Sequence, residues 1–170
     1  MSKSIITSRL ILKPLELANA AFMMQLLNTP NWIEFIGDRS VHSIKDAEDY
    51  LKKGSLRCLE KYGFGYYAMC LKDTGIPIGT CGLGKREGLE AADFGFAILP
   101  DFERKGYTYE ASLAIIQAAK TDFQIPYLLA ITTEDNIGSR ALLEKLGFIF
   151  EREVSLPDNP TCFWQYVLKY

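Results

Sequence analysis

The order of the predicted elements in the second half of the chain constrains the fold more than any other feature. An apolar stretch from Ala91 to Leu99 predicts a strand, and apolar periodicity predicts a helix over Tyr107 to Phe123. A second strand over Tyr127 to Thr133 and a second helix over Asn136 to Leu146 follow. Strands that alternate with helices in this way predict a mixed α/β (α+β) domain.

The rest of the chain adds strands and two earlier helices, and the full order reads β-α-α-β-β-β-α-β-α-β-β. The further predicted strands span Ile5 to Leu15, Gly65 to Lys72, Pro77 to Leu83, Phe148 to Val154 and Cys162 to Leu168. The further predicted helices span Leu17 to Asn28 and Ser43 to Gly63, the second opened by a capping box of Ser43 and Asp46. Asp73-Thr74-Gly75 predicts a tight hairpin turn.

Length and charge limit the classes of protein. The 170 residues are 48% hydrophobic, so we expect a single domain over residues 1–170 with a packed core. The formal net charge is -2, and no block of five or more like charges is present. A protein that binds a phosphate backbone needs a basic surface, so we exclude nucleic acid as the main partner.

The cysteines and the hydropathy indicate where the protein works. Cys58, Cys70, Cys81 and Cys162 form no CxxC pair, and His42 is the sole histidine, so no metal site is expected. We therefore expect reduced thiols and a cytoplasmic protein. Neither an apolar leader nor a stretch of about 18 apolar residues is present, which predicts a soluble protein without a membrane partner.

The loop Asp101 to Thr108 links a predicted strand to a predicted helix. Backbone N–H groups at a helix N-terminus have no partner inside the helix, and the helix dipole adds about half a positive charge there. Arg104 and Lys105 add full charges, and Gly106 allows close approach to the backbone. The loop therefore suits a phosphate group. A merely solvated basic segment is the alternative.

Two segments carry a resemblance here. Phe94 to Pro100 and Lys105 to Ala111 resemble the strand and pyrophosphate loop of the Gcn5-related N-acetyltransferase (GNAT) superfamily, especially its RimJ/RimL-like branch that modifies ribosomal-protein N-termini. The family loop reads Gln/Arg-x-x-Gly-x-Gly/Ala. This chain keeps Gly106 but has Glu103 and Thr108 at the first and last positions. A carboxylate at residue 103 would repel a nearby pyrophosphate.

The segment from Asn136 to Phe148 is similar to the family's Asn-x-x-Ser/Ala … Lys-Leu-Gly-Phe segment. Helical spacing places Asn136, Ser139 and Leu143 on one face of the helix. It places Leu142 and Leu146 on the core side. A purely structural interpretation is also open, because Asn136 is a good helix N-cap residue.

Other parts of the chain extend the resemblance. Ile78 to Leu83 resembles the family's third strand, and Thr7 to Leu15 resembles its opening segment. The resemblance implies a central mixed, mostly antiparallel sheet of about seven strands flanked by about four helices. Asn31 to Lys61 is the least familiar part, and in this family that region helps to form the acceptor pocket. Four aromatic residues could line that pocket or belong to the core: Trp32, Phe35, Tyr66 and Tyr67.

The resemblance implies transfer of an acetyl group from acetyl-CoA, as co-substrate and without a metal, to a primary amine. The acceptor would be a protein N-terminus or a small-molecule amine, and the protein a monomer or homodimer. A non-catalytic acyl-CoA-binding module of the same fold is the alternative. The residues implied to bind the coenzyme are Phe96, Ala97, Ile98, Arg104, Lys105, Gly106, Tyr107, Thr108, Asn136, Ser139 and Lys145.

The chemistry needs a proton acceptor and help for the leaving group, because an alkyl amine with a pKa near 10 is mostly protonated at pH 7. Many relatives carry a thiolate-facing tyrosine where this chain has Leu143. The resemblance instead implies that Ser139 donates a hydrogen bond to the sulfur. It implies Glu151 as the base, acting through water, with Asp93 and Glu110 as alternatives.

Overall fold

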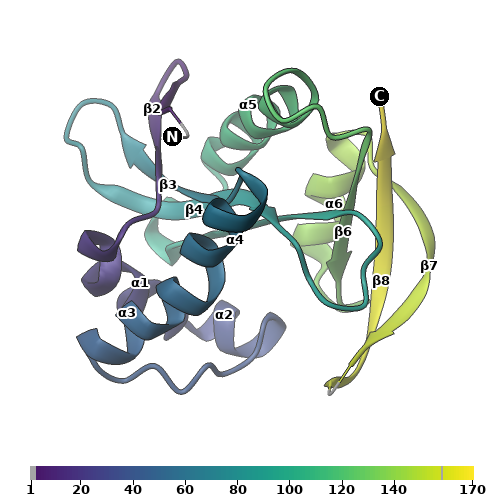
Figure 1. Cartoon of the computed structure of the whole chain (residues 1–170), viewed down its shortest axis with the longest axis horizontal. Coiled ribbons are helices and arrows are strands. Elements are labelled where there is room, and N and C mark those ends of the chain that lie inside the picture. The colour runs from purple at the N-terminus through teal and green to yellow at the C-terminus, as the bar shows by residue number, and fades with distance from the viewer. Residues whose placement is uncertain (1–2, 158) are drawn as a thin grey trace.

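A computed structural model describes residues 3–157 and 159–170 and contains one mixed sheet (Figure 1). Its eight strands lie in the order β1-β2-β3-β4-β5-β6-β8-β7. The strands are β1 (Ile5–Ile6), β2 (Leu10–Pro14), β3 (Tyr66–Leu71), β4 (Pro77–Gly84), β5 (Ala92–Ile98), β6 (Tyr127–Thr132), β7 (Ile149–Leu156) and β8 (Asn159–Lys169). Every neighbouring pair is antiparallel except β5 and β6. The predicted mixed, mostly antiparallel sheet is confirmed.

The helices fall into an N-terminal group and two later helices. They are α1 (Ala20–Leu27), α2 (Pro30–Phe35), α3 (Ile44–Leu51), α4 (Arg57–Tyr62), α5 (Tyr107–Thr121) and α6 (Ile137–Lys145). A π-helical turn, Lys52–Leu56, joins α3 to α4 without a break, so the helix predicted to run towards Gly63 is confirmed. Short 3₁₀ turns stand at Leu17–Asn19 and Pro100–Phe102.

Three local predictions differ from the structure. The strand predicted from Ile5 to Leu15 is a hairpin of β1 and β2, because the Thr7 hydroxyl oxygen accepts a hydrogen bond from the Leu10 N–H at 3.1 Å. The first helix ends before Thr29, as predicted, but Pro30 begins a further helix, α2, that was not predicted; a missing N–H costs nothing at a helix start. Ser43 caps α3 as predicted, but Asp46 accepts from the N–H of His42, one residue earlier than in a capping box.

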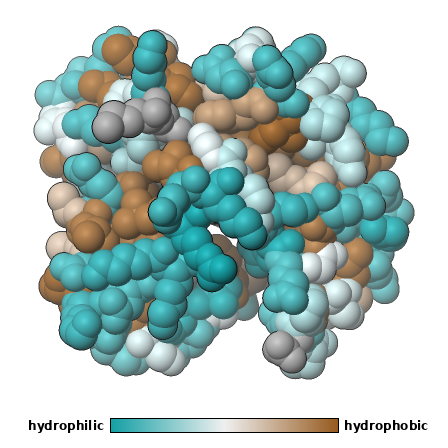
Figure 2. All heavy atoms as spheres, viewed as in Figure 1, coloured by the Kyte–Doolittle hydropathy of each residue, from teal (hydrophilic) through white to brown (hydrophobic). Residues whose placement is uncertain are grey.

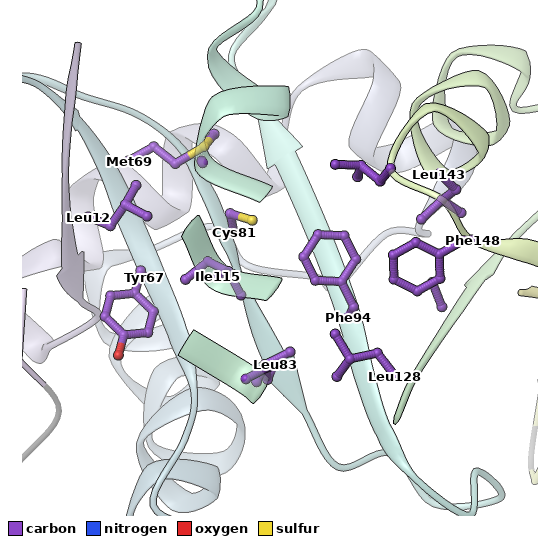
Figure 3. Close-up of a cluster of buried hydrophobic side chains, with 14 of the residues drawn as sticks. Leu12, Tyr67, Met69, Cys81, Leu83, Phe94, Ile115, Leu128, Leu143 and Phe148 are labelled. Atoms are coloured by element: carbon purple, nitrogen blue, oxygen red, sulfur yellow. The ribbon is translucent and has the colours of Figure 1, made fainter. Parts of the chain in front are cut away.

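The core has two layers, one on each face of the sheet. Side chains alternate along β3, so Tyr67 and Met69 join the cluster under α5 and α6, whereas Ala68 and Cys70 join the cluster under α1 to α3. Figure 3 shows the first cluster, with the rings of Phe94 and Phe148 side by side at 5.5 Å between centroids.

The sheet opens between β5 and β6. Their only paired residues are Ala92 with Leu128 and Asp93 with Leu129, although β5 continues to Ile98. On its other edge β5 stays paired with β4 as far as Ile98. Beyond Asp93, the peptide groups of β5 that face β6 therefore have no strand partner, and they border a gap that a ligand can enter.

Candidate active site

A cavity of about 1450 Å³ follows this opening. Its wall combines the unpaired part of β5, the facing part of β6, the N-termini of α5 and α6, the helices α2 to α4 and the loop from β4 to β5. Figure 2 shows the surface hollowed near its centre, with hydrophilic side chains around the hollow. Phe96, Ala97 and Ile98, which the resemblance implied as coenzyme-binding residues, lie on the wall.

The loop before α5, at one end of the cavity, has a backbone geometry that suits an anion, and we call it the anion loop. Gly106 is the N-cap residue, with a φ of 79°, and Arg104 has a φ of 59°, so two residues of the loop adopt the left-handed conformation. Successive N–H groups in such a turn point towards one place, and the helix dipole favours negative charge there. Arg104, Gly106, Tyr107 and Thr108 line the cavity. The geometry suits a phosphate group.

Arg9 fastens this loop from the start of β2. Its guanidinium lies 2.7 Å from the Glu110 carboxylate of α5, donates to the carbonyl oxygen of Lys105 at 2.8 Å, and lies over the Tyr107 ring at 4.4 Å. Thr7 donates a further hydrogen bond to Glu110 at 2.7 Å. Burial alone would raise the pKa of Glu110, but the hydrogen bonds from Thr7 and Arg9 outweigh it and lower that pKa.

Two charged residues of this loop bind other groups of the protein. The Asn31 amide of α2 donates to the Glu103 carboxylate at 2.7 Å, which gives this departure from the family pattern a partner. Lys105 donates to the carbonyl oxygen of Asp101 at 2.8 Å and lies over the Phe102 ring. Lys105 is not among the residues that line the cavity, so the structure does not bring it together with the other predicted coenzyme residues.

Helix α6 contributes the opposite wall. The Asn136 side chain accepts from the Ser139 N–H at 3.1 Å, so it caps the helix and lines the cavity at once. The Ser139 hydroxyl lines the cavity and has no hydrogen-bond partner among the described residues. Lys145 also lines the wall and lies 4.3 Å from the Tyr109 ring centre.

The core side of α6 differs from the prediction. Leu143, expected beside Asn136 and Ser139, is 1% exposed and belongs to the core with Leu146, whereas Leu142 is only partly buried. Figure 3 shows Leu143 directed towards Phe94 and Phe148. Because α6 lies at the edge of the opening, the side chains between its buried face and its exposed face can contact either the core or the cavity.

An ion pair between a half-buried arginine and a buried carboxylate stands where β5 and β6 separate. The Arg86 guanidinium lies 2.9 Å from the Asp93 carboxylate, whose side chain is 4% exposed. Burial raises the pKa of Asp93, against the opposing effect of Arg86. Burial also raises the pKa of Tyr66, with a further contribution from the charge of Asp93. The Tyr66 hydroxyl lies so close to Gly95 that a Cβ there would meet it at 2.5 Å.

The predicted base, Glu151, lies apart from this group. It sits on β7 at an irregularity of the β7–β8 ladder, is exposed, and accepts a hydrogen bond from the Gln165 amide at 2.7 Å. Glu151 is not among the cavity-lining residues. Glu110, the other alternative, lies on α5 and is held there by Arg9.

Among the aromatic candidates, Trp32, Phe35 and Tyr66 line the cavity, whereas Tyr67 is 2% exposed in the core. Sequence reasoning missed the structural role of Arg9. Its signal was the position of Arg9 inside the family-like opening segment. Sequence reasoning also missed a row of cations on the cavity wall. The regular spacing of these lysines and arginines along the sequence was the signal that could have found it.

The chain matches the family model described as Acetyltransferase (GNAT) domain over residues 9–149. It belongs to the GNAT acetyltransferase family. The match begins at Arg9 and ends at the first residue of β7, so it contains the opening between β5 and β6, the anion loop and all of α6. As a GNAT family member, the protein is an N-acetyltransferase.

Similar proteins agree with this assignment. The "Uncharacterized N-acetyltransferase YjdG" of Bacillus subtilis is 32% identical over 108 residues, which cover 63% of this chain and 62% of that protein. An acetyltransferase of Agrobacterium tumefaciens has a similar structure, with a TM-score of 0.85, 20% identity, and coverage of 100% of this chain and 96% of that one. RimL, a ribosomal-protein α-N acetyltransferase solved with coenzyme A, has a TM-score of 0.81 at 17% identity and 98% coverage of both chains.

The GNAT fold binds acetyl-CoA, and enzymes with this fold acetylate amines. In the described part of the chain, no helix is long and apolar enough to cross a membrane. The same residues contain no group of three or more His, Cys, Asp or Glu side chains able to hold a metal ion.

Proposed function

We propose that this chain transfers the acetyl group of acetyl-CoA to a primary amine, on a protein N-terminus or a small molecule, by direct attack of the amine. The observation that carries the proposal is the shared cavity. The unpaired edge of β5, the anion loop before α5 and the Ser139 hydroxyl all border it.

The coenzyme fits this cavity chemically. Its pyrophosphate would accept hydrogen bonds from the N–H groups at the start of α5, beside Arg104 and Gly106. The amides of its pantetheine arm would pair with the free peptide groups of β5 between Phe94 and Ile98, as an added strand does. Asn136 and Lys145 would hold the arm from the side of α6.

Between heavy atoms, the reaction replaces the C–S bond of the thioester with a C–N bond. The nitrogen of the neutral amine attacks the thioester carbonyl carbon, the new C–N bond forms, and the C–S bond breaks. The nitrogen loses a proton to a base, and coenzyme A departs as a thiolate. The unpartnered Ser139 hydroxyl would donate a hydrogen bond to that sulfur, which stabilises the developing negative charge.

Two carboxylates are candidates for the base. Glu151 would act through water, because Gln165 holds its carboxylate and it does not border the cavity. Asp93 borders the cavity at the closed end of the opening, and burial raises its pKa, which makes its carboxylate a stronger proton acceptor than an ordinary aspartate. A base must be ionised, so the rate falls as the pH falls through its pKa.

The test is release of free thiol from acetyl-CoA with a panel of amines, followed by the same assay on Asp93→Asn and Glu151→Gln. We expect turnover with at least one class of primary amine. The variant that lacks the base should lose about 10²–10⁴-fold at pH 7 and less at pH 9, where neutral amine is more abundant. No thiol release with any amine would contradict the proposal.

A further inference from the structure

Positively charged side chains outnumber negatively charged ones on the cavity wall. Its wall contains eight cationic side chains, namely Arg39, Lys53, Arg57, Lys61, Lys85, Arg86, Arg104 and Lys145. It contains four carboxylates, Glu87, Asp93, Glu103 and Asp135. The whole chain carries a formal net charge of -2. The positive cavity is therefore a local feature and not a consequence of composition.

Three of these cations form a row on the continuous helix of α3, the π turn and α4. Lys53, Arg57 and Lys61 follow one another at intervals of four residues, and all three line the cavity. In the described residues no carboxylate lies within ion-pair distance of any of them. We call them the cationic row.

The other lysines of the same helix behave differently. Lys45 pairs with Asp49 at 3.6 Å, and Lys52 pairs with Glu48 at 3.7 Å and with Asp49 at 3.8 Å. None of these four residues lines the cavity. The acidic residues of α3 thus neutralise the outer lysines, whereas the cationic row has no ion-pair partner in the described residues.

The cationic row lies away from the anion loop. The π turn and α4 pack against the start of β3 and the end of β4, where Ser55 accepts from the Tyr66 N–H at 2.9 Å and Cys58 approaches the Leu83 carbonyl oxygen. The end of β4 pairs with the beginning of β5, whereas the anion loop follows the end of β5. The phosphates of a coenzyme on that loop do not account for the charge of the row.

We propose that the cationic row binds carboxylate or phosphate groups of the acceptor, so that the enzyme prefers amines that carry negative charge. This inference rests on the proposed function and names its acceptor class. Helical rise spreads the row over about 12 Å, the length of three to four extended residues, which suits several acidic groups along one acceptor. Polyamines are disfavoured, because like charges repel across the cavity.

The test compares matched acceptors by thiol release. One arm uses peptides that begin Ser-Ala and continue with Asp-Glu, Asn-Gln or Lys-Lys; the other arm uses aspartate and glutamate against asparagine and glutamine. We expect kcat/KM to be about tenfold higher for the acidic member of at least one arm, and the arm that shows the preference identifies peptide or small molecule. Added salt should reduce the preference.

The variant Lys53→Gln/Arg57→Gln/Lys61→Gln should abolish the preference through KM while leaving the KM for acetyl-CoA unchanged. All three side chains are exposed, so the fold should survive. The matched control is Lys45→Gln/Lys52→Gln on the outer face, which should keep the preference. An acidic preference that the triple variant retains, or no preference in wild type, overturns the inference.

A binding measurement separates this inference from the proposed function. A fluorescent Ser-Ala-Asp-Glu peptide is titrated into protein saturated with coenzyme A. If the wild type binds the peptide and the triple variant does not, the cationic row is supported even when no amine is acetylated. The absence of acetylation would then contradict the proposed function but not this inference. Equal binding by wild type and the triple variant overturns the inference.

Discussion

The two ends of the cavity differ in whether their charged side chains already have partners in the protein. At the proposed coenzyme end, which the loop before α5 forms, Arg9 and Glu110 hold that loop and Asn31 binds Glu103. At the proposed acceptor end, which the cationic row borders, Lys53 and Arg57 have no ion-pair partner in the described residues. The coenzyme end has its contacts in place before a ligand arrives, which lowers the cost of binding. The acceptor end keeps its charges for a partner.

This difference follows from what each end must recognise. A shared co-substrate allows a fixed loop geometry, and the family model covers that loop. An acceptor differs from enzyme to enzyme, and exposed side chains on α3 and α4 can change without disturbing the sheet. The variants below test whether the two ends are as separate as this account requires.

We expect the largest effect from Gly106→Glu, which should weaken acetyl-CoA binding on the order of a hundredfold. Residue 106 has a left-handed φ of 79°, a Cβ would lie 3.3 Å from the Arg9 guanidinium, and the new carboxylate would enter the anion site. Calorimetry with acetyl-CoA measures the affinity.

The matched control for this variant is Gly75→Glu. Gly75 has a similar φ of 73° in the β3–β4 turn, has open space around its Cβ position, and does not line the cavity. It should show comparable backbone strain with unchanged affinity. Full affinity in a folded Gly106→Glu protein would remove the loop from the coenzyme site.

Ser139→Ala should lower kcat by about tenfold to a hundredfold, because it removes the hydrogen bond to the departing thiolate. Coenzyme affinity should change little, because the backbone N–H that binds Asn136 remains. Steady-state kinetics on a confirmed amine provide the measurement. A rate equal to that of wild type between pH 7 and 9 would assign leaving-group assistance to another group, such as Asn136 or water.

Glu110→Gln should have the smallest effect, a loss of about 2–4 °C in Tm at pH 7 with a severalfold rise in the KM for acetyl-CoA. The pKa of Glu110 is lowered in the folded protein, so its contribution is present above its ordinary pKa and disappears as the pH falls through the lowered value. The Tm difference should therefore shrink in acid. A difference that is constant from pH 7 to pH 3 would contradict this assignment.

The sequence allowed prediction of most of the sheet, because the apolar patterns are strong. It also singled out the loop before α5 and Asn136, which belong to contiguous motifs and border one cavity in the structure. It did not predict α2, because Pro30 has the same local signal at the end of one helix and at the start of another. Nor did it predict the contact between Arg9 and Glu110, which are 101 residues apart in the sequence.

The acceptor end was harder to predict for a different reason. Lys53, Arg57 and Lys61 have a regular spacing, but a helix with this spacing can turn them towards solvent or towards a cavity. Only the packing of α4 against β3 and β4 decides between these orientations. Glu151 was predicted from a motif position, whereas the irregularity of the β7–β8 ladder and the contact with Gln165 depend on the partner strand.

A crystal structure with acetyl-CoA tests the central claim most directly. The account predicts that the pyrophosphate oxygens lie about 2.7–3.2 Å from the N–H groups at the start of α5. The pantetheine arm should lie between β5 and β6, with the thioester sulfur within hydrogen-bonding reach of the Ser139 hydroxyl. A coenzyme bound outside the opening, or a pyrophosphate away from the Arg104–Gly106 loop, would contradict the account.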